Sequence, residues 1–125
     1  MEVQPAPGAL SRAIAVTLPV EIDVANADRI GEELYSACGT GAPVVVADMA
    51  ATTFCDSTGI RALAGVHKRA AARGTELRLA VPCAALRRAF IQRGLAVPIF
   101  PRLEAALRLE PWAGMHRWWP GLTME

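Results

Sequence analysis

The sequence lacks several features that would assign a class of protein at once. Its longest apolar runs fall far short of the ~20 residues that span a bilayer. The N-terminus, MEVQPAPGAL, has no basic stretch followed by an apolar one, so no secretory signal is visible. Three cysteines without a C-x-x-C spacing argue against a zinc site and against a disulfide framework. The sequence therefore predicts a cytoplasmic protein with reduced thiols.

The usual motifs of catalysis and cofactor binding are missing as well. A hydrolase would show G-x-S-x-G around Ser57, but Cys55 stands where the first glycine belongs. The only histidines are His67 and His116, so a Ser-His-Asp site is disfavoured and a hydrolase is the third alternative. No G-x-G-x-x-G or Walker pattern occurs, and no set of acids and histidines has the spacing of metal ligands. We therefore expect no enzyme activity, no cofactor and no metal.

What the chain does have is the composition of one globular domain. Its 125 residues are 53% hydrophobic and 20% charged, which is enough apolar side chain for a single core. The net charge of +1 argues against nucleic acid as the main partner. Residues 1–56 hold eight acidic and two basic residues, whereas residues 57–125 hold four acidic and eleven basic ones. This asymmetry favours a dipolar surface that orients a protein partner.

Hydrophobic periodicity predicts strands that alternate with helices. Residues 1–12 are expected to be a flexible N-terminus, residues 13–109 a folded domain and residues 110–125 a separate tail. The predicted strands cover residues 13–18, with an extension to 22, and residues 44–47, 76–81 and 99–100. The predicted helices cover residues 25–38, 57–73, 84–93 and 103–109. Such alternation indicates βα units and a mostly parallel sheet.

Single residues refine this outline. In the strand 76–81 the alternation predicts leucine and valine side chains inward, with Glu76 and Arg78 toward solvent. His67 projects onto the apolar side of its helix and is expected to be packed, without a functional role. Gly94 and Leu95 are expected to end their helix in a Schellman motif. Four basic residues share the outer side of the helix 57–73: Arg61, Lys68, Arg69 and Arg73. Their side chains are expected to be solvated, and part of this face can contact an acidic partner.

The stretch FCDSTGIRAL, residues 54–63, is the most unusual local feature. It places the hydroxyls of Ser57 and Thr58 after Asp56, where a strand hands over to a helix. From the residues alone, such a place can cap the helix, cradle a phosphate, hold a nucleophile or accept a regulatory phosphate. Spacing alone favours capping by Ser57, because a side-chain oxygen there accepts from an otherwise unpaired backbone N–H.

The residues around this stretch resemble a known family. The segment VVVADMAATTFCDSTGIRALAGVHKRAAARGTELRLA, residues 44–80, is similar to the core of the STAS domain, and the D-S-T-G-I element is its most specific part. Asp48 at a strand end, the R-G-x-x-L-R-L passage at 73–79 and the R-G-L turn at 93–95 support the resemblance, which spans residues 13–109. It implies a single α/β domain with a small, mixed, mostly parallel sheet and about four helices mainly on one face.

The resemblance also implies a function, that of an anti-sigma-factor antagonist. The unphosphorylated form of such a protein binds an anti-sigma factor, a serine kinase with a histidine-kinase-like ATPase fold, and so releases the sigma factor. Phosphorylation of Ser57, with Thr58 as the fallback acceptor, switches this binding off, and a serine phosphatase restores it. The alternative is a STAS subunit of a lipid-transport ABC system that docks on its ATPase. Neither function involves nucleic acid or membrane insertion.

The resemblance assigns a set of residues to partner binding: Asp23, Asn26, Asp56, Ser57, Thr58, Gly59 and Arg61. Cys55 and Cys83 are expected to follow neighbouring parallel strands, and they are candidates for a redox-sensitive pair. The tail lies outside the resemblance and holds all three tryptophans, Trp112, Trp118 and Trp119. With so few basic residues the tail is a poor membrane-surface segment, so packing on the domain is favoured.

Overall fold

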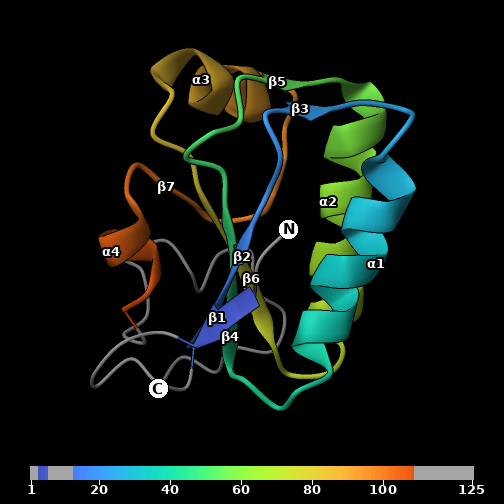
Figure 1. Ribbon diagram of the computed structural model, residues 1–125, viewed down its shortest axis with the longest axis vertical. Helices are drawn as coiled ribbons and strands as arrows, with labels where there is room; N and C mark the ends of the chain where they lie inside the picture. Colours follow the sequence, from blue (N-terminus) through green and yellow to red (C-terminus); the bar gives the residue numbers. More distant parts are fainter. Residues whose placement is uncertain (1–2, 6–12, 109–125) are drawn as a thin grey trace.

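The computed structural model describes residues 3–5 and 13–108, and these form an α/β domain around a five-stranded sheet (Figure 1). The strand order is β1-β2-β4-β6-β7; β1 runs antiparallel to β2, and the other neighbours are parallel. The strands are β1 (Val3–Pro5), β2 (Ala13–Thr17), β4 (Val44–Asp48), β6 (Glu76–Ala80) and β7 (Ile99–Phe100). The predicted small, mixed, mostly parallel sheet is therefore confirmed.

The helices cover the two faces of the sheet unequally. They are α1 (Ala27–Cys38), α2 (Ser57–Ala71), α3 (Ala84–Gln92) and α4 (Leu103–Ala106). The first three contribute to one large apolar core, in which α1 and α2 lie side by side on one face of the sheet (Figure 1). The short α4 packs on the opposite face over a smaller apolar cluster. The expectation of four helices mainly on one face is thus confirmed.

A second, very short sheet was not predicted. Here β3 (Glu21–Ile22) pairs in parallel with β5 (Phe54–Cys55), and we call this pair the β3–β5 ribbon. The backbone N–H of Asp56 donates to the carbonyl of Ile22 at 3.0 Å. The buried hydroxyl of Thr52 donates to the carbonyl of Pro19 at 2.7 Å. The ribbon therefore joins the turn before α1 to the start of α2, at the upper end of the molecule in Figure 1.

The boundaries of the other elements follow the sequence analysis within a few residues. The helix expected over 25–38 begins at Ala27, and the one expected over 103–109 is shorter. Gly94, with φ of +74°, and Leu95, whose N–H donates to the Phe90 carbonyl at 3.1 Å, form the predicted Schellman stop. Residues 3–5, assigned to a flexible N-terminus, instead form β1. The predictions for the tryptophans of the tail lie outside the described residues.

The expectation that Glu76 and Arg78 face solvent is wrong. Their exposed fractions are only 4% and 1%, because β6 lies between β4 and β7 and α4 covers this face. The Arg78 guanidinium donates to both carboxylate oxygens of Glu76, with Nε to Oε2 at 2.9 Å and Nη2 to Oε1 at 3.1 Å. Its Nη1 donates to the carbonyls of Ala106 and Arg108 at the end of α4. The buried Arg78, which pairs with Glu76 on the same strand, thus joins the end of α4 to the sheet.

Two of the predicted absences concern the described part of the chain. No helix within residues 3–5 and 13–108 is long and apolar enough to cross a membrane. In the same part of the chain, no three His, Cys, Asp or Glu side chains gather as a metal ion would require. His67 is packed as expected, with 7% exposed, and burial lowers the pKa of its imidazole.

Candidate functional site at the start of helix α2

The first turn of α2 is organised by Asp56, which is the N-cap. Its Oδ1 accepts from the backbone N–H of Gly59 at 3.1 Å and from the hydroxyl of Thr58 at 2.7 Å. The hydrogen bond from Thr58, followed by that from Gly59, holds the pKa of the Asp56 carboxyl below its usual value. Asp56 is therefore ionised at neutral pH. The interpretation of Ser57 as the cap is wrong, because its neighbour Asp56 has that role.

Ser57 and Thr58 differ in what their hydroxyls do. Thr58 is half-buried and its hydroxyl is engaged by Asp56. Ser57 is the first residue of α2, is exposed, and makes no side-chain hydrogen bond within the described residues. A hydroxyl in this position is accessible to another protein without any rearrangement of the cap. The two hydroxyls thus differ in the structure: that of Thr58 binds the cap residue Asp56, and that of Ser57 is exposed.

Asp23 and Asn26 brace the turn between β3 and α1. The Asp23 Oδ1 accepts from the backbone N–H of Ala25 at 2.9 Å. The Asn26 side chain accepts from the N–H of Asp23 at 3.0 Å and donates to the carbonyl of Glu21 at 2.8 Å. Because β3 pairs with β5, this turn lies beside the start of α2. The ribbon therefore brings the candidate residues from positions 23–26 and 56–61 to one end of the molecule.

Exposed apolar side chains surround this end, and the sequence analysis did not identify them. Val20, Val24 and Phe54 are 53%, 77% and 50% exposed, and all three belong to the ribbon or its adjoining turns. Apart from Ile91, they are the exposed large hydrophobic residues of the described chain. Contiguous exposed apolar surface commonly marks an interaction site. A single valine in a turn gives no such signal in the sequence, where Val20 and Val24 are 30 or more positions from Phe54.

The basic residues of α2 divide into two groups. Arg69 stacks on Tyr35 of α1, with 3.7 Å between its guanidinium carbon and the ring centroid. Arg73 donates to the Tyr35 hydroxyl at 2.9 Å. Arg61 and Lys68 are exposed and make no hydrogen bond or ion pair with the described residues. Of the four, only Arg61 stands near the start of the helix, where its charge also contributes slightly to the lowered pKa of Asp56.

The three cysteines are free thiols in different environments. Cys38 is buried, Cys55 is half-buried and Cys83 is exposed. Burial raises the pKa of Cys38 to about 11, and burial together with the nearby charge of Asp56 raises that of Cys55 to about 11. A thiol with so high a pKa is a poor nucleophile, because the thiolate is the reactive form. The redox role of Cys55 and Cys83 stays a prediction, and the burial of Cys55 argues against it.

We expect the thiols to react in a fixed order. Iodoacetamide at pH 8 should label Cys83 first. Cys55 and Cys38 should react at least about tenfold more slowly, because only a small fraction of each thiol is ionised at this pH and burial restricts access of the reagent. Intact-mass and peptide mapping against time would measure this, and unfolded protein, in which all three should react, is the control. Labelling of Cys55 as fast as Cys83 would contradict the assignment.

Comparison with known proteins now places the chain. The family model of the STAS domain matches residues 4–106. The chain belongs to the STAS domain family. The match begins in β1 and ends in α4, so it includes the described sheet except Val3, and the β3–β5 ribbon. No curated protein sequence matches.

Solved structures share the fold at low sequence identity. An anti-sigma factor antagonist from Mycobacterium paratuberculosis is 23% identical, with a TM-score of 0.66, covering 85% of this chain and 90% of that one. A sulfate transporter family protein from Wolinella succinogenes is 23% identical, with a TM-score of 0.68 and coverage of 77% and 82%. The Bacillus cell fate determinant SpoIIAA in its phosphorylated form is 20% identical, with a TM-score of 0.60 and coverage of 87% and 100%. These likenesses support the STAS fold and no finer assignment.

Proposed function

We propose that this STAS domain is an anti-sigma-factor antagonist that is switched by phosphorylation of Ser57. In its unphosphorylated form it binds an anti-sigma factor with a histidine-kinase-like ATPase fold and so releases the sigma factor. That partner phosphorylates Ser57, and a serine phosphatase reverses the modification. The observation that carries the proposal is the exposed, unengaged hydroxyl of Ser57 at the start of α2, next to exposed apolar surface.

The surroundings of Ser57 suit both states of such a switch. In the unphosphorylated state a partner can cover the serine together with Val20, Val24 and Phe54, whose burial supplies a hydrophobic contribution. A phosphate adds about −1.5 to −2 charge at pH 7. The N-terminus of α2 stabilises a negative charge by only about 0.3–1 kcal/mol, and the ionised Asp56 is adjacent. The fold therefore tolerates the phosphate, whereas a closed partner interface must desolvate it.

The test uses the chain with purified anti-sigma kinases and ATP, and maps the phosphate by mass spectrometry. We expect phosphate on Ser57, none on Ser57→Ala, and nearly unchanged incorporation in Thr58→Ala, because the Thr58 hydroxyl is held by Asp56. Ser57→Asp should remain folded and bind the anti-sigma factor at least about tenfold more weakly than the unphosphorylated wild type does. This is a loss of about 1.4 kcal/mol or more in binding free energy. Ser36→Asp is the matched control, since Ser36 is exposed near the other end of α1.

Two results would overturn the proposal. One is full phosphate incorporation into Ser57→Ala, and the other is wild-type affinity of Ser57→Asp. The likeness to a sulfate transporter family protein favours, as the second candidate, a STAS subunit attached to a transport system such as a lipid-transport ABC system. Affinity capture separates the two functions, because the first retains a histidine-kinase-like ATPase and the second an ABC ATPase.

A further inference from the structure

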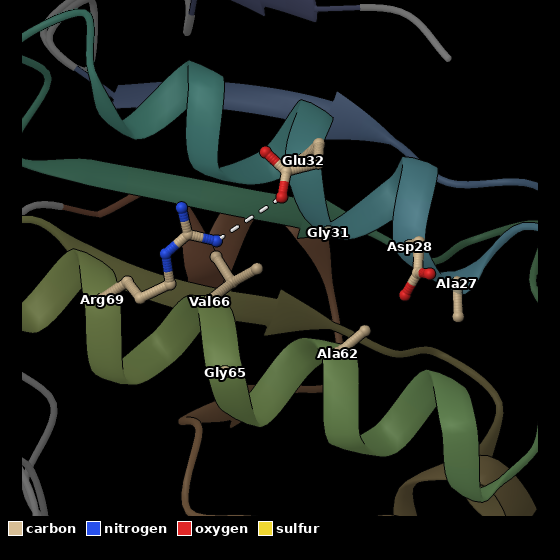
Figure 2. A pocket seen from close by; sticks show the side chains of 8 residues that line it. All are labelled: Ala27, Asp28, Gly31, Glu32, Ala62, Gly65, Val66 and Arg69. Carbon is tan, nitrogen blue, oxygen red and sulfur yellow. Dashed lines mark ion pairs between the residues drawn. The ribbon is translucent and has the colours of Figure 1, made fainter.

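The outer surface formed by α1 and α2 faces away from the sheet and carries charges of opposite sign on its two helices. The helix α1 has three acidic residues and one arginine, whereas α2 has three basic residues and no acid. Asp28 and Glu32 of α1 and Arg69 of α2 form the rims of a groove between the helices (Figure 2). Lys68 and Arg61 are exposed on α2. We call this surface the α1–α2 face.

The floor of the groove is made of small residues. Gly31, Ala62 and Gly65 line it together with the buried Val66 (Figure 2). A Cβ on Gly31 would meet Ala62 and Val66 at 3.7 and 3.8 Å, which is ordinary van der Waals contact. Nothing inside the fold requires glycine at position 65, because a Cβ there would meet nothing within 4 Å, and its φ is not positive. Glycine inside a helix is less stable than alanine, so Gly65 costs helix stability without any gain inside this chain.

We infer that a second copy of this chain docks on the α1–α2 face to form a two-fold symmetric dimer. In such a dimer the same surface meets itself. Because α1 and α2 run side by side, a two-fold axis parallel to the helices places α1 of one copy over α2 of the other. Asp28 and Glu32 of each copy then face basic side chains of the other copy. An axis across the helices would instead place acidic α1 on acidic α1, so the charges select the first arrangement.

The same arrangement accounts for Gly65. It lies on the part of α2 that α1 of the second copy would cover, where a missing side chain lets two helices approach closely. The ion pair between Glu32 and Arg69 within one chain does not compete strongly, since its closest atoms are 3.7 Å apart and the side chains are 73% and 50% exposed. A two-helix surface is small for an interface, so we expect a weak dimer that dissociates in salt.

The inference goes beyond the proposed function and needs no partner protein to test. Sedimentation equilibrium of the full chain should show a dimer, twice the 13.3 kDa of the monomer, which weakens as salt is raised toward about 1 M. The variant Asp28→Lys/Glu32→Lys makes both helices basic, and Lys68→Glu/Arg69→Glu makes both acidic. Each variant alone should self-associate at least about tenfold more weakly than the wild type.

Mixing the two variants is the decisive measurement. A basic and an acidic variant present opposite charges across both halves of the proposed interface, so an equimolar mixture should form a heterodimer. Gly65→Leu should weaken the wild-type dimer by placing a side chain under the second copy. Circular dichroism of every variant checks that it is folded. A wild-type chain that stays monomeric at low salt, or a mixture of folded variants that fails to associate, overturns the inference.

Discussion

Replacing Arg78 by methionine is expected to lower the free energy of unfolding by about 3–5 kcal/mol, because it leaves the carboxylate of Glu76 buried without its partner. The Glu76 carboxylate is engaged by the Arg78 guanidinium through two hydrogen bonds of 2.9 and 3.1 Å, and its side chain is only 5% exposed. The same substitution removes the donor for the carbonyls of Ala106 and Arg108, so the end of α4 should loosen as well.

A double variant separates the ion pair from packing. In Glu76→Leu/Arg78→Met both charges are gone, so most of the loss should be recovered. Recovery should be incomplete, since the α4 carbonyls still lack their donor. Urea unfolding measures all three proteins, and Arg88→Met, at an exposed position of α3, is the control, with an expected change within about 0.5 kcal/mol. If Arg78→Met lowered the free energy of unfolding by less than about 1 kcal/mol, Arg78 would not be what neutralises Glu76 and holds α4 on the sheet.

This pair also shows where sequence reasoning stops. The run at 44–47 was correctly predicted as a strand; nothing polar interrupts it, and these four residues of β4 are buried. In β6 the alternation of leucine with Glu76 and Arg78 has the pattern of a half-exposed strand. What makes it a buried strand is its central place in the sheet and the cover by α4, which comes from residues about 30 positions later. A pattern confined to one strand does not contain that information.

The site was predicted in part for a similar reason. The hydrophobic periodicity correctly predicted the start of α2 at Ser57. The resemblance ranked Ser57 above Thr58 as the acceptor, but the sequence did not show that the Asp56 carboxylate binds the Thr58 hydroxyl. The β3–β5 ribbon has strands of two residues, too short to show any periodicity. That the exposed Val20 and Phe54 belong to neighbouring segments was evident only once that ribbon was known.

The ribbon also imposes a constraint on α2 that a second substitution should reveal. Gly59 is buried where α2 meets the ribbon, and a Cβ built on it would lie 2.6 Å from the Cys55 sulfur and 2.7 Å from Cγ2 of Ile22. Both contacts are shorter than real side chains tolerate, so one element must move. Gly59→Ala should therefore lower the free energy of unfolding by about 1–3 kcal/mol, as overpacking does in a filled core.

Gly65→Ala is the matched control, six residues further along the same helix, where the added methyl group meets nothing within 4 Å. It should leave stability unchanged or raise it by about 0.5–1 kcal/mol, since alanine is the better helix former. Adding Cys55→Ala to Gly59→Ala removes one of the two clashes and should recover part of the loss. Equal effects of Gly59→Ala and Gly65→Ala in urea unfolding would refute the close contact.

The same contact predicts an effect on the candidate site. The strain in Gly59→Ala lies between the cap of α2 and the ribbon that carries Phe54. Gly59→Ala should therefore also slow phosphate incorporation at Ser57, whereas Gly65→Ala should not.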